Sequence, residues 1–128
     1  MRVLLDTAPF LWFAMGAPEL SQRVRDLVLD EGNPVFVSAV SAWEIAVKYD
    51  LGRLALAERP ETLLPAIRKA YAIEALALEE VAVLHLHRLP KLHRDPFDRM
   101  LVCQAVAHGL TLATPDDEIR RYPVPTVW

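Results

Sequence analysis

The sequence lacks several features that would assign the chain to a class of protein at once. Its only cysteine is Cys103, so no disulfide can form within the chain. A buried structural thiol is the favoured interpretation, because Cys103 lies within the apolar run 100–106. No apolar stretch approaches the roughly 20 residues that span a bilayer, and the first residues lack the pattern of a secretory leader. We therefore expect a cytoplasmic protein without a membrane segment.

A strong excess of one charge is also absent. Lys and Arg number 14 and Asp and Glu 17, for a net charge of −3, so the whole molecule is not expected to attract nucleic acid. A polyanion would have to meet a local basic cluster instead. The one dense cluster contains Arg88, Lys91, His93, Arg94 and Arg99. Surface solvation explains Arg88 and Lys91 equally well, whereas we favour Arg94 and Arg99 as substrate contacts.

The length of 128 residues predicts a single domain, residues 1–128, that is large enough to bury a hydrophobic core. A hydrophobic fraction of 53% is high for a solvated monomer of this size. It indicates a spare apolar surface for a partner.

Short apolar runs alternate with segments of helical character. This alternation predicts a parallel sheet with helices on both faces. The expected strands are 2–5, 35–37, 73–76, 111–113 and 124–127. The expected helices are 8–15, 18–30, 42–49, 60–71, 79–87, 97–108 and 115–121.

Four segments of the chain each carry an acid where a helix is expected to begin. These acids are Asp6, Glu44, Asp98 and Asp116. Ligands of parallel sheets bind outside the carboxyl ends of the strands, and two of the four acids come shortly after expected strands. We therefore expect the four carboxylates to converge there.

Each acid alone also has an ordinary explanation as a helix cap. Ser41 and Glu44 have the spacing of a capping box. Asp95 before Pro96 is a common N-cap, and the charge of Asp98 would complement the helix dipole, as would that of Asp116. Asp6 is harder to explain in this way, because Thr7 is available to cap the helix that follows it.

Converging carboxylates would have raised pKa values unless a divalent ion offset their repulsion. Oxygen ligands select Mg²⁺ or Mn²⁺ over zinc. Such a site suits phosphodiester hydrolysis by an activated water and needs no side-chain nucleophile.

Taken in order, these residues resemble the PIN-domain nucleases, and specifically the toxin ribonucleases of the VapBC class of bacterial toxin-antitoxin pairs. The matching segments are Leu5-Asp6-Thr7, Ser38-x-x-Ser41-x-Trp43-Glu44-Ile45 with Lys48 and Gly52, His93-Arg94-Asp95-Pro96-Phe97-Asp98-Arg99, and Thr114-x-Asp116. Each segment alone is weak, but the ordered set is specific and covers nearly the whole chain.

The resemblance implies a three-layer α/β/α fold with a central parallel sheet of four to five short strands. It also implies Mg²⁺- or Mn²⁺-dependent cleavage of RNA, inhibition by a small antitoxin protein, and homodimers. The acidic quartet of the family matches Asp6, Glu44, Asp98 and Asp116, as catalytic residues and metal ligands. Asp98 is preferred to Asp95 because it directly precedes the buried helical run. The supporting positions match Thr7 and Thr114, with Asp95 as a further candidate.

Two sets of residues keep alternative interpretations. Lys48 lies four residues after Glu44, so an ion pair along a helix explains it at least as well as binding of an RNA phosphate. The aromatic residues Trp12, Phe13, Trp43 and Tyr49 are each more simply assigned to the core than to an antitoxin groove.

Two other functions also fit the acids. A Mg²⁺-dependent phosphatase or phospho-acceptor domain can be built on an acid-bearing parallel sheet. A binding module without catalytic activity would use the acids only as helix caps.

Overall fold

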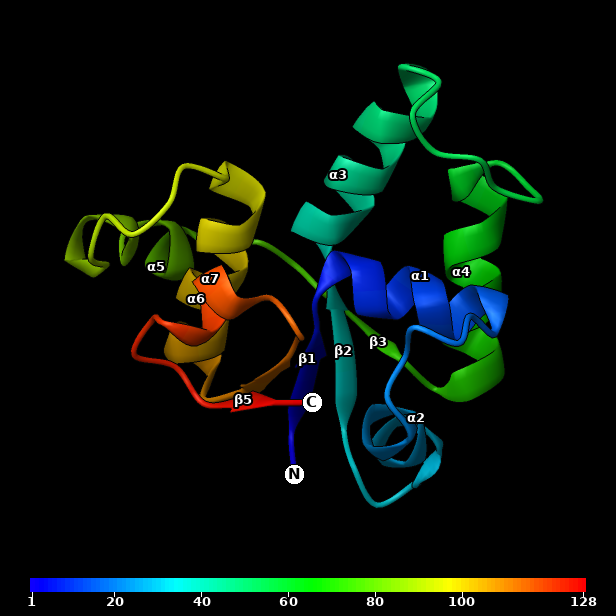
Figure 1. The fold of residues 1–128 in the computed structure, drawn as a ribbon, viewed down its shortest axis with the longest axis horizontal. Helices are drawn as coiled ribbons and strands as arrows, with labels where there is room; N and C mark the ends of the chain where they lie inside the picture. The colour runs from blue at the N-terminus through cyan, green and yellow to red at the C-terminus, as the bar shows by residue number, and fades with distance from the viewer.

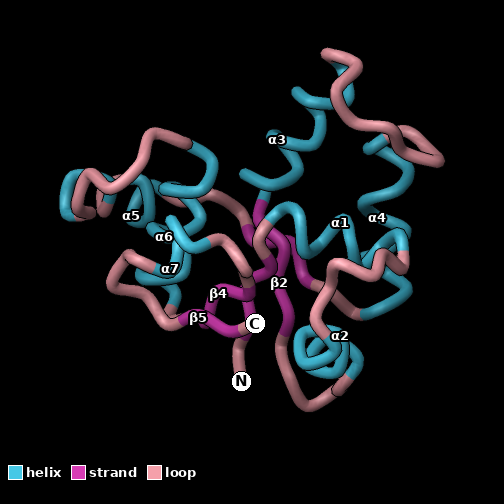
Figure 2. The backbone as a smooth tube through the Cα atoms, viewed as in Figure 1, coloured by secondary structure: helices cyan, strands magenta, loops and turns pink.

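The strands form a single parallel sheet at the centre of the molecule (Figures 1 and 2). The computed structural model describes residues 1–128. The strands, in chain order, are β1 (Val3–Leu5), β2 (Val35–Ser38), β3 (Glu74–Leu76), β4 (Thr111–Ala113) and β5 (Thr126–Val127). Their order across the sheet is β3-β2-β1-β4-β5, and every pair is parallel. The chain thus adds β2 and β3 on one side of β1 and then β4 and β5 on the other side.

Helices cover both faces of the sheet. They are α1 (Thr7–Met15), α2 (Gln22–Leu29), α3 (Ala39–Asp50), α4 (Pro60–Tyr71), α5 (Glu80–Val83), α6 (Pro96–His108) and α7 (Asp117–Arg120), with a 3₁₀ turn η1 (Leu86–Arg88). In Figure 1, α1, α2 and α4 lie on one side of the strands and α5, α6 and α7 on the other. The three-layer α/β/α architecture expected from the sequence is confirmed.

The strand β1 separates two hydrophobic cores. Val3 and Leu5 point into a core formed with α1, α2 and α4, whereas Leu4 points into a core formed with α6 and α7. Successive side chains of a strand point to opposite faces, so a strand between two helical layers is apolar throughout. All three side chains of β1 are fully buried.

Some boundaries differ from the sequence prediction. The second helix begins at Gln22 rather than near residue 18, because the Ser21 hydroxyl caps it by accepting from the Val24 amide at 3.2 Å. Residues 79–87 do not form one helix but the short α5 followed by η1. The last strand contains only Thr126 and Val127 rather than four residues.

Two helix caps also differ from the prediction, and both bear on the acids. Asp6, not Thr7, caps α1, and its carboxylate accepts from the Thr7 amide at 2.8 Å. The capping box predicted for Ser41 and Glu44 does not form, because α3 starts three residues earlier with Ser38 as its cap. Glu44 therefore lies in the middle of a helix, where it has no capping role.

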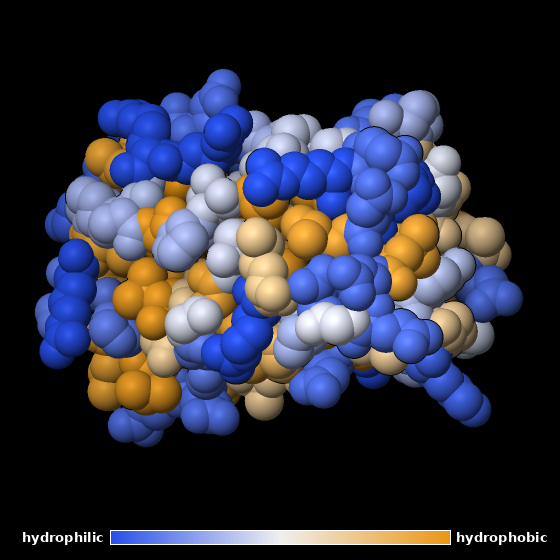
Figure 3. All heavy atoms as spheres, turned by 90° about the horizontal axis from the view of Figure 1, so that it is seen from below, coloured by the Kyte–Doolittle hydropathy of each residue, from blue (hydrophilic) through white to orange (hydrophobic).

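No helix is both long and apolar enough to cross a bilayer. The face seen from below in Figure 3 mixes hydrophilic and hydrophobic residues rather than presenting one continuous apolar surface. The acidic residues lie at the opposite edge, where the strands end and α1, α3 and α6 begin (Figure 1).

Candidate active site

Asp6 lies at the carboxyl end of β1, where the chain leaves the centre of the sheet. Its side chain is only 7% exposed, and its amide donates to the Ala113 carbonyl at the end of β4 at 3.1 Å. Both carboxylate oxygens are engaged. One accepts from the Thr7 amide and the other from the Thr114 hydroxyl, each at 2.8 Å. Asp6 is therefore held in place beside β1 and β4, where the order of strands across the sheet reverses.

Glu44 approaches from α3 and is as buried as Asp6, at 5% exposed. The Thr7 hydroxyl donates to Glu44 Oε1 at 2.7 Å and lies 2.8 Å from the Ser41 hydroxyl. The other Glu44 oxygen pairs with Lys48 one turn later along the helix. The ion pair proposed for Lys48 from its spacing is thus present. Thr7 joins the start of α1 to the buried face of α3.

Asp98 belongs to the first turn of α6. Asp95 caps this helix by accepting from the amides of Phe97 and Asp98 at 2.9 and 3.2 Å, as its position before Pro96 predicted. The carboxylate of Asp98 is contacted by His93, whose Nε2 lies 3.3 Å from Oδ2. The other nitrogen of that ring lies 2.8 Å from the hydroxyl of Tyr122.

Asp116 follows β4 and caps α7 by accepting from the Glu118 amide at 2.9 Å. Its own amide donates to the Thr114 hydroxyl at 3.0 Å, and the same hydroxyl donates to Asp6. Thr114, which is fully buried, therefore connects the two acids at the ends of β1 and β4.

The electrostatics show that the acids from separate segments share one environment. Burial raises the pKa of Asp6 to about 6, with the negative charges of Glu44 and Asp116 acting in the same direction. Burial also raises the pKa of Asp98 to about 8, with further contributions from Asp6, Asp95, Asp116 and Glu44. The four acids predicted to meet, together with Asp95, thus lie close enough to repel one another.

The carboxylates are chemically suited to bind a divalent cation, but they do not form a complete set of metal ligands in this structure. No three His, Cys, Asp or Glu side chains are spaced as a set of metal ligands. The donors are carboxylate oxygens, the ligands that Mg²⁺ and Mn²⁺ prefer. Uncompensated carboxylates with raised pKa values favour a bound positive charge.

Basic residues lie on the α6 side of the acids. A surface pocket of about 400 Å³ is lined by Lys91, Leu92, His93, Arg94 and Arg99. Arg94 is exposed, whereas the Nε of Arg99 is buried and has no hydrogen-bond acceptor. The cations that line this pocket suit an anion such as a phosphate.

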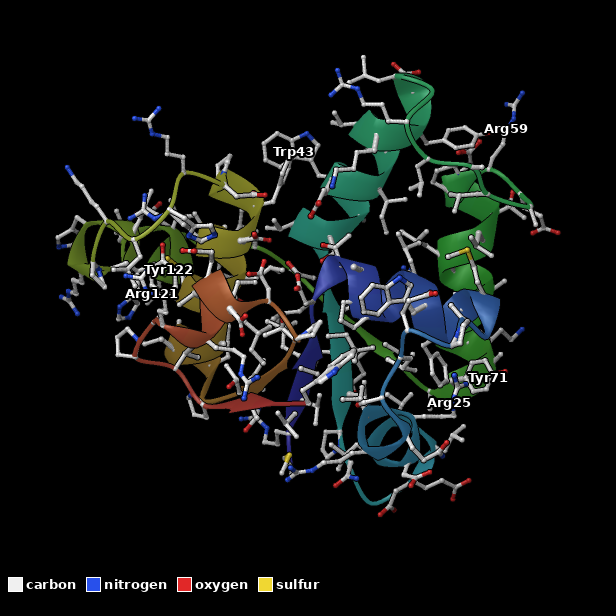
Figure 4. The ribbon with its side chains drawn as sticks, in the orientation of Figure 1. Arg25, Trp43, Arg59, Tyr71, Arg121 and Tyr122 are labelled. Carbon is white, nitrogen blue, oxygen red and sulfur yellow. The ribbon has the colours of Figure 1, made fainter.

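Two residues of this site were missed at the level of sequence. Tyr122 lies outside every motif, and only the fold brings it from the C-terminal segment to the α6 side of the sheet (Figure 4). Ser41 was interpreted as a cap, although it is completely buried and contacts Thr7. No sequence signal identifies Tyr122, whereas the spacing of three between Ser41 and Glu44 did suggest that they act together.

Comparison with known proteins supports the family resemblance seen in the sequence. The sequence model of the PIN domain matches residues 3–125. Ribonuclease VapC16 from Mycobacterium tuberculosis is 31% identical over 109 residues, which cover 84% of this chain and 72% of that protein.

Solved structures share the fold at lower identity. VapBC2 from Rickettsia felis, bound to a DNA fragment from its promoter, has a TM-score of 0.76 at 18% identity and covers 100% of this chain and 99% of its own. DNA-bound VapBC from Salmonella typhimurium has a TM-score of 0.71 at 19% identity over 99% and 97% of the two chains. FitAcB from Neisseria gonorrhoeae has a TM-score of 0.63 at 19% identity over 98% and 96%. The chain therefore belongs to the PIN domain family and is of the VapC type.

Proposed function

We propose that this protein is a divalent-metal-dependent endoribonuclease and the toxin of a toxin-antitoxin pair. The observation that supports this proposal is the linkage of Asp6, Glu44 and Asp116 through the Thr7 and Thr114 groups. Burial and the charges of neighbouring acids also raise the pKa of Asp6 and of Asp98, and Asp6 is among the acids that act on Asp98. Capping accounts for Asp6 and Asp116 but not for Glu44, which is buried in the middle of α3, nor for Asp98, since Asp95 caps α6.

Asp6, Asp98 and Asp116 would hold one or two Mg²⁺ ions, with Mn²⁺ as an alternative, and Glu44 would help to position the metal or the attacking water. A bound ion would supply the positive charge that activates water and offsets the charge developing on the phosphate. Because no ligand set is preformed, binding would require the carboxylates to turn toward one another. Burial keeps bulk water away and strengthens each interaction with the phosphate.

The supporting residues limit how far the acids can move. Thr114 holds Asp6 and the backbone of Asp116, and Thr7 holds Glu44. Asp95 fixes the first turn of α6, which carries Asp98. Partners of this kind orient metal ligands and tune their basicity.

The basic pocket beside α6 would bind the phosphates that flank the cleavage site. Arg94 is free to reach an exposed phosphate, and Arg99 has an N–H without an acceptor. Lys48 is half exposed, so it could leave Glu44 for a phosphate once a metal compensates that carboxylate. These cations would compensate locally for the net negative charge of the chain.

The partners proposed are a small antitoxin protein and a second copy of the chain. Support comes from the structural relatives, which are solved as VapBC and FitAB assemblies. Exposed apolar side chains on α3 and just after it, including Val47 and Leu51, would suit a protein contact.

The test is the Asp6→Asn variant, which keeps the shape of the side chain and removes its charge. We expect the variant to fold and to lose divalent-ion-dependent cleavage of single-stranded RNA by about 100-fold or more. The matched control is Asp117→Asn, because Asp117 directly follows Asp116 but is exposed and its side chain makes no hydrogen bond or ion pair; this variant should cleave normally. Full activity of Asp6→Asn would refute the proposal. Hydrolysis of small phosphate esters without RNA cleavage would favour a phosphatase instead.

A further inference from the structure

Trp43 is the most exposed aromatic residue beside the acidic site. It lies on α3 directly before Glu44 and is 59% exposed, although tryptophan is a large apolar residue and the next residue is buried. In Figure 4 its ring projects from α3 toward the neighbouring helix α6. The expectation that Trp43 fills the core is therefore wrong for this residue.

The ring of Trp43 is supported from α6. Its centroid lies 4.7 Å from that of Phe97, and the two planes meet at 71° in an edge-to-face contact. Phe97 directly precedes Asp98, just as Trp43 directly precedes Glu44. The aromatic pair therefore bridges the two helices that carry acids of the site, and the contact restricts the Trp43 ring while leaving most of its surface open.

The surroundings of Trp43 are better suited to binding a nucleic acid than to packing in a protein core. Lys48 is on the same helix and pairs with Glu44, the residue after Trp43, while Asp98 directly follows Phe97, so a cation and two acids are carried on the helices that bear the aromatic pair. The pockets between α3 and α4, where apolar side chains gather, are lined by Ala46, Val47 and Tyr49 but not by Trp43. Proteins hold single-stranded nucleotides by stacking bases on exposed aromatic rings beside a basic groove.

We propose that Trp43, braced by Phe97, is a stacking platform for one nucleobase of the RNA next to the phosphate held at the acids. This inference rests on the proposed ribonuclease function and adds a base-binding subsite to it. Stacking is tolerant of base identity, because every base presents an aromatic face. The platform would hold an unpaired nucleotide in place, so it would favour single-stranded over double-stranded RNA.

The first experiment measures binding of a single-stranded RNA oligonucleotide by the full chain in the Asp6→Asn background, where cleavage is suppressed. Stacking of one base is worth about 1–3 kcal/mol, so Trp43→Leu should weaken binding by about 5- to 150-fold. Trp43→Phe keeps an aromatic face and should recover most of the affinity. The matched control is Tyr49→Leu, which removes another exposed aromatic residue of α3, on the side of the α4 pockets, and should bind like the parent.

The second experiment uses oligonucleotides in which one nucleotide at a time is made abasic. One position should weaken binding to the parent and have no effect on Trp43→Leu, because the lost base and the lost ring remove the same contact. If every abasic position weakened binding equally in the parent and in Trp43→Leu, the stacking proposal would be overturned, whereas the proposed nuclease function would stand. A changed oligomeric state of Trp43→Leu with unchanged RNA affinity would overturn the stacking proposal as well, in favour of a contact with a second copy. Absence of RNA binding and cleavage in the wild type would overturn the proposed function and the platform together.

Discussion

The two halves of the acidic site differ in how their carboxylates are held. On the sheet side, Asp6 is 7% exposed and both its oxygens accept short hydrogen bonds. On the α6 side, the Asp98 side chain is 15% exposed, and its one hydrogen-bond partner is His93 at 3.3 Å. Yet the pKa of the more buried acid rises only to about 6, whereas that of the other rises to about 8.

The difference shows that hydrogen bonds offset much of the cost of burial for one acid. The Thr114 hydroxyl and the Thr7 amide both stabilise the charged form of Asp6 and lower its pKa. Asp98 accepts from neither a hydroxyl nor a backbone amide, and four other acids act on it. The charge of Asp6 is therefore partly compensated within the chain, whereas that of Asp98 is opposed most strongly.

The largest expected effect is on the pH dependence of stability. The pKa values of Asp6 and Asp98 are higher in the folded chain than in the unfolded chain, so folding binds protons. Without divalent ions, the free energy of unfolding should therefore be highest near pH 4 and fall by several kcal/mol as the pH rises to about 8, with the larger share from Asp98. Thermal melts in EDTA between these pH values measure this fall.

Two controls sharpen this pH experiment. Adding Mg²⁺ should raise the melting temperature more at pH 8 than at pH 5, because a metal binds the charged carboxylates. Asp98→Asn should remove most of the fall in unfolding free energy above pH 6, because of the two acids only Asp98 still loses its proton there. A stability that stays constant from pH 4 to 8 without metal would show that the two acids do not share a buried environment.

A smaller effect is expected from Thr114→Val, which removes the hydroxyl at nearly constant volume. Asp6 would lose a donor and the Asp116 amide an acceptor, so unfolding should become easier by about 2 kcal/mol. The pKa of Asp6 should move up toward that of Asp98, which NMR titration would detect. Thr111→Val, at the start of the strand that Thr114 follows, is the control, since no side-chain hydrogen bond involves Thr111. An unchanged Asp6 pKa would show that burial alone sets the difference between the halves.

The smallest effect on stability is expected from Tyr122→Phe. The variant removes only the hydroxyl that contacts His93, so unfolding should change by less than about 1 kcal/mol. The His93 ring would be freer to turn away from Asp98, and RNA cleavage should fall by about 10-fold. Tyr71→Phe is the control, since the exposed Tyr71 lies on α4, away from the site. Unchanged cleavage would show that the α6 half does not depend on this contact.

Much of the fold could be predicted from local patterns. The strand β1 was identified because its apolar residues leave no polar face, and α6 because apolar residues surround it almost completely. Gly109 marked the end of α6, where its φ of +64° is a conformation that glycine adopts without strain. The helix at residues 60–71 was also located correctly.

The interpretation of single polar residues was less successful. Ser41 and Glu44 have the spacing of a capping box, but Ser38 caps the helix instead, and both residues are buried inside it. Thr7 was expected to be a cap and instead binds Glu44. A capping pattern describes only neighbouring residues, so it cannot detect a partner that lies more than thirty positions away. Of the aromatic residues expected in the core, Phe13 is buried, whereas Trp43 and Tyr49 are exposed.

By itself, the sequence determined the alternation of strands and helices and the positions of Asp6, Asp98 and Asp116 at or near helix starts, because strand burial and helix starts depend on residues close together in the chain. Only the tertiary structure decided which partner each acid has and how strongly its charge is opposed. That outcome depends on burial and on contacts such as Thr114 with Asp6 and His93 with Tyr122. The order of strands in the sheet creates these contacts, and no local pattern encodes them.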